Sequence, residues 1–185
     1  MTRARRTLAL AVAIGVAAML SGCVDPSTAA DPSVSPSVSR VFASEEEALK
    51  AATDAYAAYT LLSSAIAIEG GKDAERIAAA TQGNAYLAAL RAFQGLQERG
   101  ERGVGAPTYD TVSVQTFDGA GHVSLYLCLD TSSTDVVDVT GKSTVAVGRT
   151  TRRPLVVSFE PNPDADPSST LLVTDSTTWQ NDDFC

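Results

Sequence analysis

SEEEALKAATDAYAAYTLLSSAIAIEGG, residues 44–71, carries the signals of one long amphipathic helix. Ser44 followed by Glu47 has the spacing of a capping box, which satisfies free backbone N–H groups at a helix start. Residues at three- and four-residue steps form one largely apolar stripe: Leu49, Ala52, Tyr56, Tyr59, Ser63 and Ile66. Because Gly70-Gly71 ends this pattern, we predict a helix that stops there and buries the stripe.

Two shorter helices are predicted to follow the long one. Asp73 can cap a helix over residues 74–80, and Asn84 can cap a third helix. The third helix would direct one set of residues inward: Leu87, Leu90, Ala92, Phe93 and Leu96. Gly100 and the stretch Gly103-Val104-Gly105 are expected to close the helical half.

The second half of the chain has the alternation and the turn residues of β-strands. We predict strands over residues 111–117, 122–130, 134–139, 143–148, 153–159 and 171–179. The turn at residues 118–121 would join the first two strands into a hairpin, and Thr140-Gly141-Lys142 would form a second turn. Helices followed by an antiparallel meander predict an α+β fold, with N-terminal helices packed on the sheet.

The N-terminus has the features of an export signal. Arg3, Arg5 and Arg6 precede an apolar run over residues 8–20, which is too short to span a bilayer. The run ends in Leu20-Ser21-Gly22-Cys23, which resembles the lipobox of bacterial lipoproteins. The resemblance implies cleavage of residues 1–22 and attachment of acyl chains such as palmitate to Cys23, on the extracytoplasmic face of the cell membrane. The alternative is an ordinary secretory signal with a chance cysteine.

The residues after Cys23 divide into a tether and one folded domain. Residues 23–40 are rich in proline, serine and threonine and contain no aromatic residue, so we expect a spacer that does not fold. Residues 41–185 are predicted to form the single α+β domain. The formal net charge of the chain is −8, and it becomes −11 once the three leader arginines are removed. Such an acidic surface disfavours nucleic acid as a partner.

Two cysteines remain after processing, Cys128 and Cys185. An even pair in an exported protein predicts one disulfide, which would hold the C-terminus to a strand, although pairing with another chain stays open. Metal binding is not predicted, because the only histidine of the chain, His122, has no partner at a metal-ligand spacing.

Three segments resemble small actinobacterial lipoproteins with a cystatin-like, nuclear-transport-factor-like domain. They are Cys128-Leu129-Asp130, Asp138-Val139-Thr140-Gly141-Lys142, and Trp179 to Asp182-Asp183-Phe184-Cys185. The resemblance covers about the last two thirds of the mature domain and implies a curved antiparallel sheet cradling the helices. It implies little about function, because this fold carries enzymes, binders and scaffolds alike.

The sequence contains no recognised catalytic constellation and predicts no cofactor. Asp130 and His122 are weak candidates for a general acid or base, and four tyrosines could supply hydroxyls to a pocket: Tyr56, Tyr59, Tyr109 and Tyr126. The one basic cluster of the domain, formed by Arg149, Arg152 and Arg153, could dock an acidic partner, but we expect it to protect an edge strand with charge. Trp179 is expected to lie half-buried near the disulfide.

The predicted function is that of a non-enzymatic, lipid-anchored surface protein. It would bind a partner protein, or hold a small apolar ligand between the long helix and the sheet. One alternative is a pocket enzyme of the ketosteroid-isomerase or dehydratase kind, which requires Asp130 or His122 to face an internal cavity. A second alternative is a purely structural surface protein, which a side-chain-filled core would favour.

Overall fold

A computed structural model describes residues 40–165, 170–181 and 184–185. The predicted signal peptide (1–22), the lipidated Cys23 and all of the predicted tether except Arg40 lie outside the described residues. The chain divides into residues 1–36 and 37–185, and the fold below is that of the second unit.

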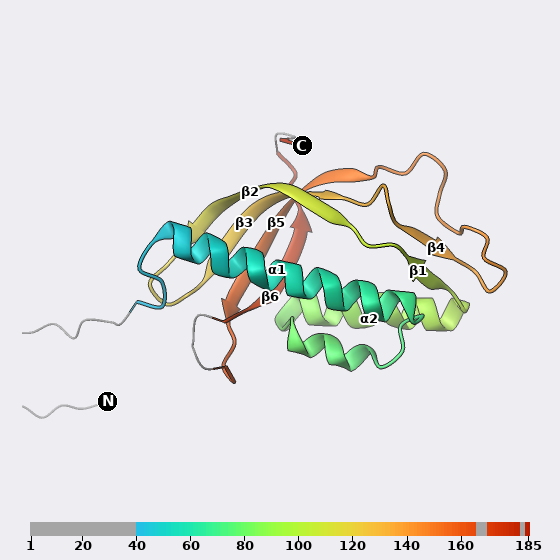
Figure 1. The fold of residues 1–185 in the computed structure, drawn as a ribbon, viewed down its shortest axis with the longest axis horizontal. Helices are drawn as coiled ribbons and strands as arrows, with labels where there is room; N and C mark the ends of the chain where they lie inside the picture. The colour runs from blue at the N-terminus through green and yellow to red at the C-terminus, as the bar shows by residue number, and fades with distance from the viewer. Residues whose placement is uncertain (1–39, 166–169, 182–183) are drawn as a thin grey trace, which may run out of the picture. The chain divides into compact units, whose positions relative to one another are not determined.

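In the described part of the chain, three helices precede six strands (Figure 1). Their order is α1 (Glu45–Ile68), the 3₁₀ helix η1 (Ala74–Ala79), α2 (Gly83–Arg99), β1 (Arg102–Val104), β2 (Thr108–Phe117), β3 (Val123–Asp130), β4 (Asp135–Val137), β5 (Arg152–Pro161) and β6 (Leu171–Thr178). A four-stranded antiparallel sheet has the order β2-β3-β5-β6, and β1 pairs with β4 in a separate two-stranded antiparallel sheet. The α+β prediction, with helices packed against antiparallel strands, is confirmed.

The start of α1 follows the predicted capping chemistry. The Glu47 backbone N–H donates to the Ser44 hydroxyl over 3.2 Å, and the Glu47 carboxylate accepts from the backbone N–H of Ala43 over 2.8 Å. Two backbone N–H groups at the start of the helix therefore have side-chain acceptors. In the usual capping box the Glu47 carboxylate would accept from Ser44, whereas here it accepts from Ala43, one residue earlier. The acidic first turn also suits the positive end of the helix dipole.

The main core lies between α1 and the inner face of the four-stranded sheet. Small side chains of α1, Ala48, Ala52 and Ala55, are buried there. They meet alternate residues of the sheet that are fully buried, among them Leu125, Leu127, Val123, Val157 and Phe159. The stripe predicted on α1 is buried at Ala52, Tyr56 and Ile66, and it is only partly buried at Leu49, Tyr59 and Ser63.

A second core joins the end of α1, η1 and α2. Its members are Ile66, Ala74, Ile77, Ala89, Phe93 and Leu96. The prediction for α2 was therefore wrong at Leu87 and Ala92, which are exposed, and right at Phe93 and Leu96. Ala85 and Ala89 are buried instead, and the residue that precedes the helix is Gln82 rather than the predicted cap Asn84.

Two predicted features of the strand region were wrong. Residues 143–148 do not form a strand; only one bridge, between Val137 and Ser143, continues the pairing beyond β4. Conversely, Gly103 and Val104 do not merely close the helical half, because they belong to β1. A Cβ at Gly103 would overlap the side chain of Ala67, so glycine allows this strand to lie directly on α1.

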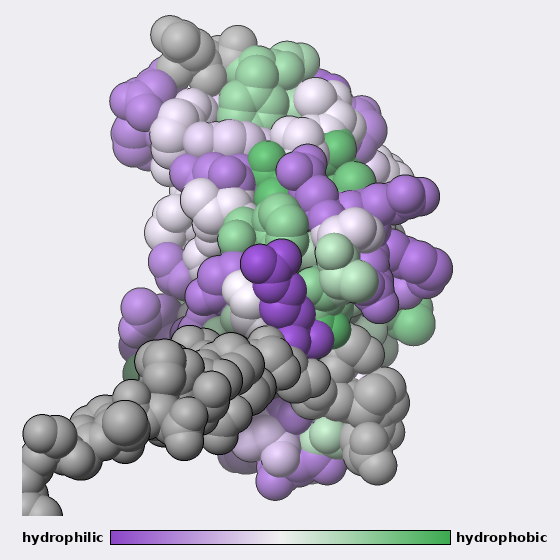
Figure 2. All heavy atoms as spheres, turned by 90° about the vertical axis from the view of Figure 1, so that its left-hand side faces the viewer, coloured by the Kyte–Doolittle hydropathy of each residue, from purple (hydrophilic) through white to green (hydrophobic). Residues whose placement is uncertain are grey.

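The described surface mixes polar and apolar residues. Figure 2, which looks onto the left-hand side of Figure 1, shows hydrophilic side chains interspersed with smaller apolar groups. Within residues 40–165, 170–181 and 184–185, no helix is both long enough and apolar enough to cross a bilayer.

The turn after α1 gives a test of close packing. Gly71 has a φ of +82°, and a Cβ built there would overlap the backbone carbonyl group of Phe93 in α2. Gly141 has a similar φ of +84°, but no atom lies within 4 Å of the position that a Cβ would take there. We expect Gly71→Ala to lower the free energy of unfolding by about 2–4 kcal/mol, and Gly141→Ala by about 1 kcal/mol, because only the first adds a clash to the backbone strain.

Urea denaturation of both variants beside the unmodified chain measures these free energies. Equal losses from the two substitutions would show that the approach of α2 to the α1–η1 turn adds nothing to the strain.

Candidate functional site

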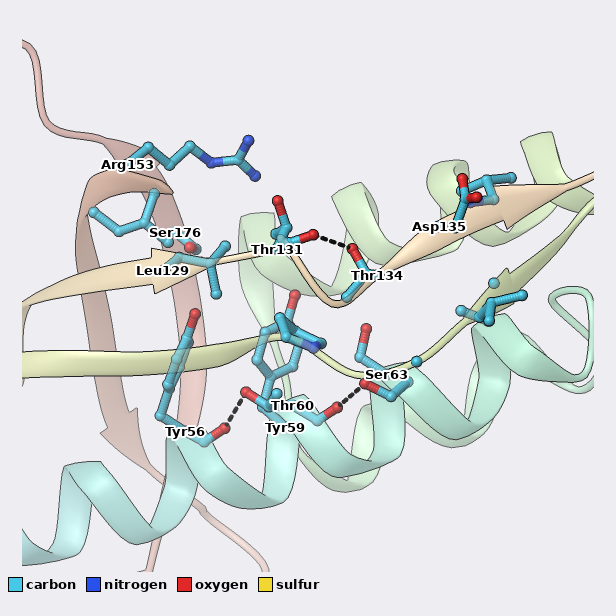
Figure 3. A pocket seen from close by; sticks show the side chains of 18 of the residues that line it. Tyr56, Tyr59, Thr60, Ser63, Leu129, Thr131, Thr134, Asp135, Arg153 and Ser176 are labelled. Carbon is cyan, nitrogen blue, oxygen red and sulfur yellow. Dashed lines mark hydrogen bonds between the residues drawn. The ribbon is translucent and has the colours of Figure 1, made fainter. Parts of the chain in front are cut away.

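A cleft of about 370 Å³ opens where α1 leaves the main core (Figure 3). One wall is the middle and the C-terminal half of α1. The opposite wall is formed by the inner-face ends of β3, β5 and β6, and the two-stranded sheet with its flanking loops completes the enclosure. Its volume falls in the range of small-molecule binding pockets, which is about 300–1,000 Å³.

The α1 wall changes from alanine to larger and hydroxylated residues. Tyr56 and Tyr59 line the cleft one turn apart, followed by Thr60, Ser63 and Ser64. The Thr60 hydroxyl donates to the Tyr56 carbonyl over 2.8 Å, and the Ser64 hydroxyl donates to the Thr60 carbonyl over 2.7 Å. These two hydroxyl protons are therefore used within the helix, whereas their oxygens can still accept a bond from a ligand.

The tyrosines of this wall form an aromatic cluster. Tyr56 meets Tyr109 of β2 edge-to-face at 4.8 Å between ring centroids, and it lies 5.8 Å from Tyr59. Burial raises the pKa of Tyr56, the neighbouring Tyr59 and Tyr109 raise it further, and the positive charge of Arg153 opposes that rise. Burial likewise raises the pKa of Tyr59. Both side chains are therefore neutral phenols at neutral pH and can donate hydrogen bonds.

The sheet wall carries the charged group of the cleft. Leu129, Leu155 and Arg153 lie on it, with the hydroxyls of Ser176 and Thr178 beside them. Arg153 is the one cation among the described lining residues, and Asp135 on the far side is the one carboxylate. Asp135 accepts hydrogen bonds from the Ser143 hydroxyl (2.8 Å) and the Val136 backbone N–H (2.7 Å).

The β3–β4 loop forms a fixed rim. Arg149 donates to the carbonyls of Thr131 and Thr134, with the Thr131 bond at 2.9 Å. The Ser133 hydroxyl donates to the Ala106 carbonyl over 2.9 Å, which ties this loop to the β1–β2 loop. The loops also touch at Gly105, where a Cβ would overlap the Ser133 carbonyl. These bonds hold the rim open over α1.

The two weak catalytic candidates do not line the cleft. Asp130 projects from β3 on the same side as Cys128, and it accepts a hydrogen bond from the Ser132 backbone N–H (2.7 Å), which lowers its pKa. His122 is exposed at the β2–β3 turn, where Asp118 lies 2.7 Å away and raises its pKa. The pocket-enzyme hypothesis requires Asp130 or His122 to face a cavity. Neither residue lines this cleft, so the cleft does not provide the catalytic group that the hypothesis needs.

The three arginines do not act as a cluster on an edge strand. β5 lies between β3 and β6, so the expectation of a charge-protected edge was wrong. Arg149 holds the β3–β4 loop, Arg153 lines the cleft, and Arg152 lies on the outer face. Side chains alternate along a strand, so Arg152 and Arg153 lie on opposite faces. The sequence shows that the two differ in face, but it does not show which of them faces the helices.

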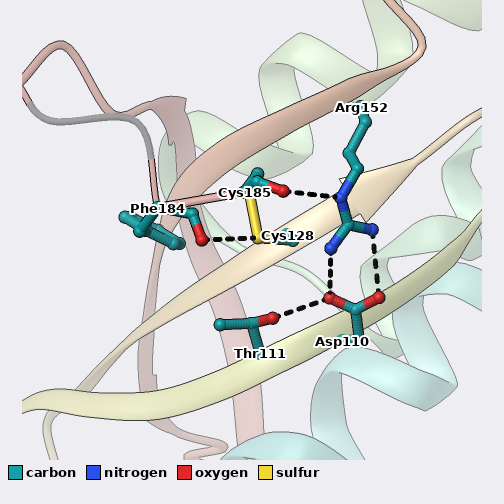
Figure 4. Close-up of a disulfide and its surroundings, with 6 residues drawn as sticks. All are labelled: Asp110, Thr111, Cys128, Arg152, Phe184 and Cys185. Carbon is teal, nitrogen blue, oxygen red and sulfur yellow. Dashed lines mark hydrogen bonds and ion pairs between the residues drawn. A yellow bond between two sulfur atoms is a disulfide. The ribbon is translucent and has the colours of Figure 1, made fainter.

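The predicted disulfide between Cys128 and Cys185 is confirmed and fixes the outer corner of the sheet (Figure 4). Beside it, Arg152 makes a two-pronged contact with Asp110 at 3.0 and 2.6 Å and donates to the backbone oxygen of Cys185 over 3.1 Å. The arginine lowers the pKa of Asp110. A crosslink between cysteines 57 residues apart raises the free energy of unfolding by about 4 kcal/mol in the chain-entropy model.

Aromatic side chains cover the outer face next to this corner. Tyr126 meets Trp179 at 5.0 Å and Phe184 at 5.5 Å, both edge-to-face. Tyr126 therefore packs beneath the C-terminal residues and does not supply a hydroxyl to the cleft, unlike Tyr56 and Tyr59. Trp179 is partly buried, as expected, and its backbone N–H donates to the carbonyl of Pro154, the residue that pairs with Cys128.

No metal centre is evident in the described part of the chain. Within it, no three side chains from histidine, cysteine, aspartate or glutamate come together in a way that could hold a metal ion. The cleft itself is lined by hydroxyls, phenols, apolar side chains, the guanidinium group of Arg153 and the carboxylate of Asp135.

Neither a known family model nor a curated protein matches this chain. Among solved structures, the intermembrane space region of the chloroplast protein ARC6 is similar with a TM-score of 0.51 and 11% identity, over 70% of this chain and 95% of that one. A protein from Catenulispora acidiphila is similar with a TM-score of 0.44 and 13% identity, over 70% of this chain and 91% of that one. At such identities the first likeness shows a shared fold alone.

The His122–Asp118 pair gives a pH prediction. The pKa of His122 is raised above 6.5, so its contribution to stability is complete below 6.5 and is lost as pH rises through the raised value. The pKa of Asp118 is lowered below 3.8, so its contribution is complete above 3.8 and is lost as pH falls through the lowered value. The pair therefore stabilises the fold most between pH 3.8 and pH 6.5. The effect is modest, because both side chains are exposed to solvent.

An NMR titration of the single histidine measures its pKa directly. We expect a pKa above 6.5 in the unmodified chain and a fall toward that value in Asp118→Asn. An Asp164→Asn control removes an equal charge from a different loop. A histidine pKa that stays unchanged in Asp118→Asn would contradict the pairing.

Proposed function

We propose that this protein is a lipid-anchored, extracytoplasmic binding protein whose cystatin-like domain holds a small ligand between α1 and the sheet. The observation that carries the proposal is the cleft itself. A side-chain-filled junction would have favoured a purely structural role, whereas here the rim loops hold a space of about 370 Å³ open.

The residues of the cleft favour binding over catalysis. The tyrosines are neutral donors at pH 7, and burial raises their pKa values further above that pH, while the carboxylate of Asp135 accepts hydrogen bonds from two donors of the protein. Such a set orients a ligand through hydrogen bonds and apolar contact, and it offers no paired acid and base.

The anchor has a direct test at Cys23. We expect cells fed an alkyne-labelled palmitate to incorporate label into the unmodified chain, which should sediment with membranes. Cys23→Ser should lose both the label and the membrane fraction, because the thiol is the acylation site. Cys185→Ser serves as the control that removes a different cysteine. Label retained by Cys23→Ser would refute the lipoprotein assignment.

The cleft has a matched test on β6. Ser176 lines the cleft, and its neighbour Thr177 is exposed on the opposite face of the same strand. We expect ligands found by a thermal-shift screen of small metabolites to lose at least tenfold in affinity with Ser176→Trp, because the indole fills their space. Thr177→Trp should bind them like the unmodified chain.

Calorimetric titration of each variant gives the affinities. Ligands that bind Ser176→Trp as well as they bind the unmodified chain would place the binding site elsewhere, and a screen without any ligand would remove the binding proposal.

A further inference from the structure

Arg152 and Arg153 are adjacent in sequence but occupy different environments. Arg152 is held on the outer face by Asp110 and by the backbone oxygen of Cys185. Arg153 belongs to the set of β5 residues that alternate toward the helices, and it pairs across the sheet with Leu129. Figure 3 shows its side chain extending over the cleft above Leu129 and Ser176.

The guanidinium group of Arg153 is available for a ligand. Within residues 40–165, 170–181 and 184–185, no group forms a hydrogen bond or an ion pair with this side chain. The carboxylate of the cleft, Asp135, is bonded to Ser143 and Val136 instead. Arg153 is also exposed, so solvent reaches the guanidinium and a ligand can replace that solvent.

The hydroxyl of Tyr56 provides a second donor in the same part of the cleft. No described group accepts its proton, and no buried side-chain oxygen of the described residues lacks a partner, so this hydroxyl opens onto the cleft. Arg153 is close enough to act on the charge of Tyr56. Both side chains line the cleft, where a cation and a neutral phenol lie beside the apolar surfaces of Leu129 and Leu155.

We propose that the cleft binds monocarboxylates, with the carboxylate on Arg153 and Tyr56 and an aromatic or aliphatic body against Leu129, Leu155 and Tyr59. This inference rests on the proposed binding function and names its ligand class. The planar fork of arginine matches the two oxygens of a carboxylate. One arginine suits one negative charge, and the net charge of −11 that remains without the three leader arginines repels ligands that carry several negative charges more strongly.

Matched acids and amides test this assignment on the whole chain purified in detergent. The probes are benzoate, phenylacetate, 2-naphthoate, indole-3-acetate and octanoate, each beside its primary amide, titrated by calorimetry at pH 7. We expect the acids that bind to do so at least tenfold more tightly than their amides. Arg153→Gln should weaken the acids about 10- to 100-fold and leave the amides within about twofold, because only the acids lose a charged hydrogen bond.

Two further variants separate charge from geometry. Arg153→Lys keeps the charge without the fork, so its affinity for the acids should lie between those of the unmodified chain and Arg153→Gln. Arg91→Gln, an exposed change on α2 away from the cleft, should leave the affinity for the acids unchanged.

The outcomes separate this inference from the function on which it rests. Amides that bind as well as acids, or an equal loss of both in Arg153→Gln, would overturn the carboxylate assignment while the cleft remains a binding site. Acids that bind Ser176→Trp unchanged, or no binding by any probe or by any metabolite in the thermal-shift screen, would defeat both proposals.

Discussion

The close approach of α1 to the sheet governs the arrangement of the whole domain. Alanines at positions 48, 52 and 55 bring the first half of the helix against Leu125, Leu127 and Val157, whose side chains are fully buried. The next residues on that side are Tyr56 and Tyr59, and the ring of Tyr56 packs edge-to-face against Tyr109 of β2. The cleft begins there, so one helix contributes to both the packed core and the open site.

The second half of α1 is covered by different elements. β1 lies on it at Gly103, and the β3–β4 loop is tied to the β1–β2 loop across the top of the cleft. Arg149 supplies the hydrogen bonds that fix this loop, which places a charged side chain in a structural role. The Arg152–Asp110 ion pair and the Cys128–Cys185 disulfide both lie on the outer face of the sheet. Neither involves Arg153, which lines the cleft on the inner face.

The likeness to a solved chloroplast domain shows that this helix-on-sheet arrangement recurs in a protein of very different sequence. At 11% identity it carries no residue of the site across, and folds of this kind serve unrelated activities. The side chains of the cleft, rather than this likeness, support ligand binding. Their common property is the ability to donate hydrogen bonds beside apolar surface, which is typical of sites that orient small molecules.

Local sequence signals determined much of the fold, because capping, helical periodicity and turn chemistry act over a few residues. The start and end of α1, the hairpin around Gly119 and Gly121, and all the predicted strands except residues 143–148 follow from such signals. Cysteine parity likewise predicted the Cys128–Cys185 bridge. The leader and Cys23 are also predicted by sequence alone, and they lie outside the described residues.

Only the tertiary structure decided the composition of the site. The three arginines form one cluster in the sequence, but pairing of β5 between β3 and β6 sends Arg152 and Arg153 to opposite faces. β1 was not predicted, because three residues that include a glycine are too short to show the alternation of a strand. Its pairing with β4 and its contact with α1 are tertiary interactions. Asp130 and His122 likewise lie away from the cleft. The face that a side chain occupies depends on strand register and long-range packing, and local sequence does not encode either of these.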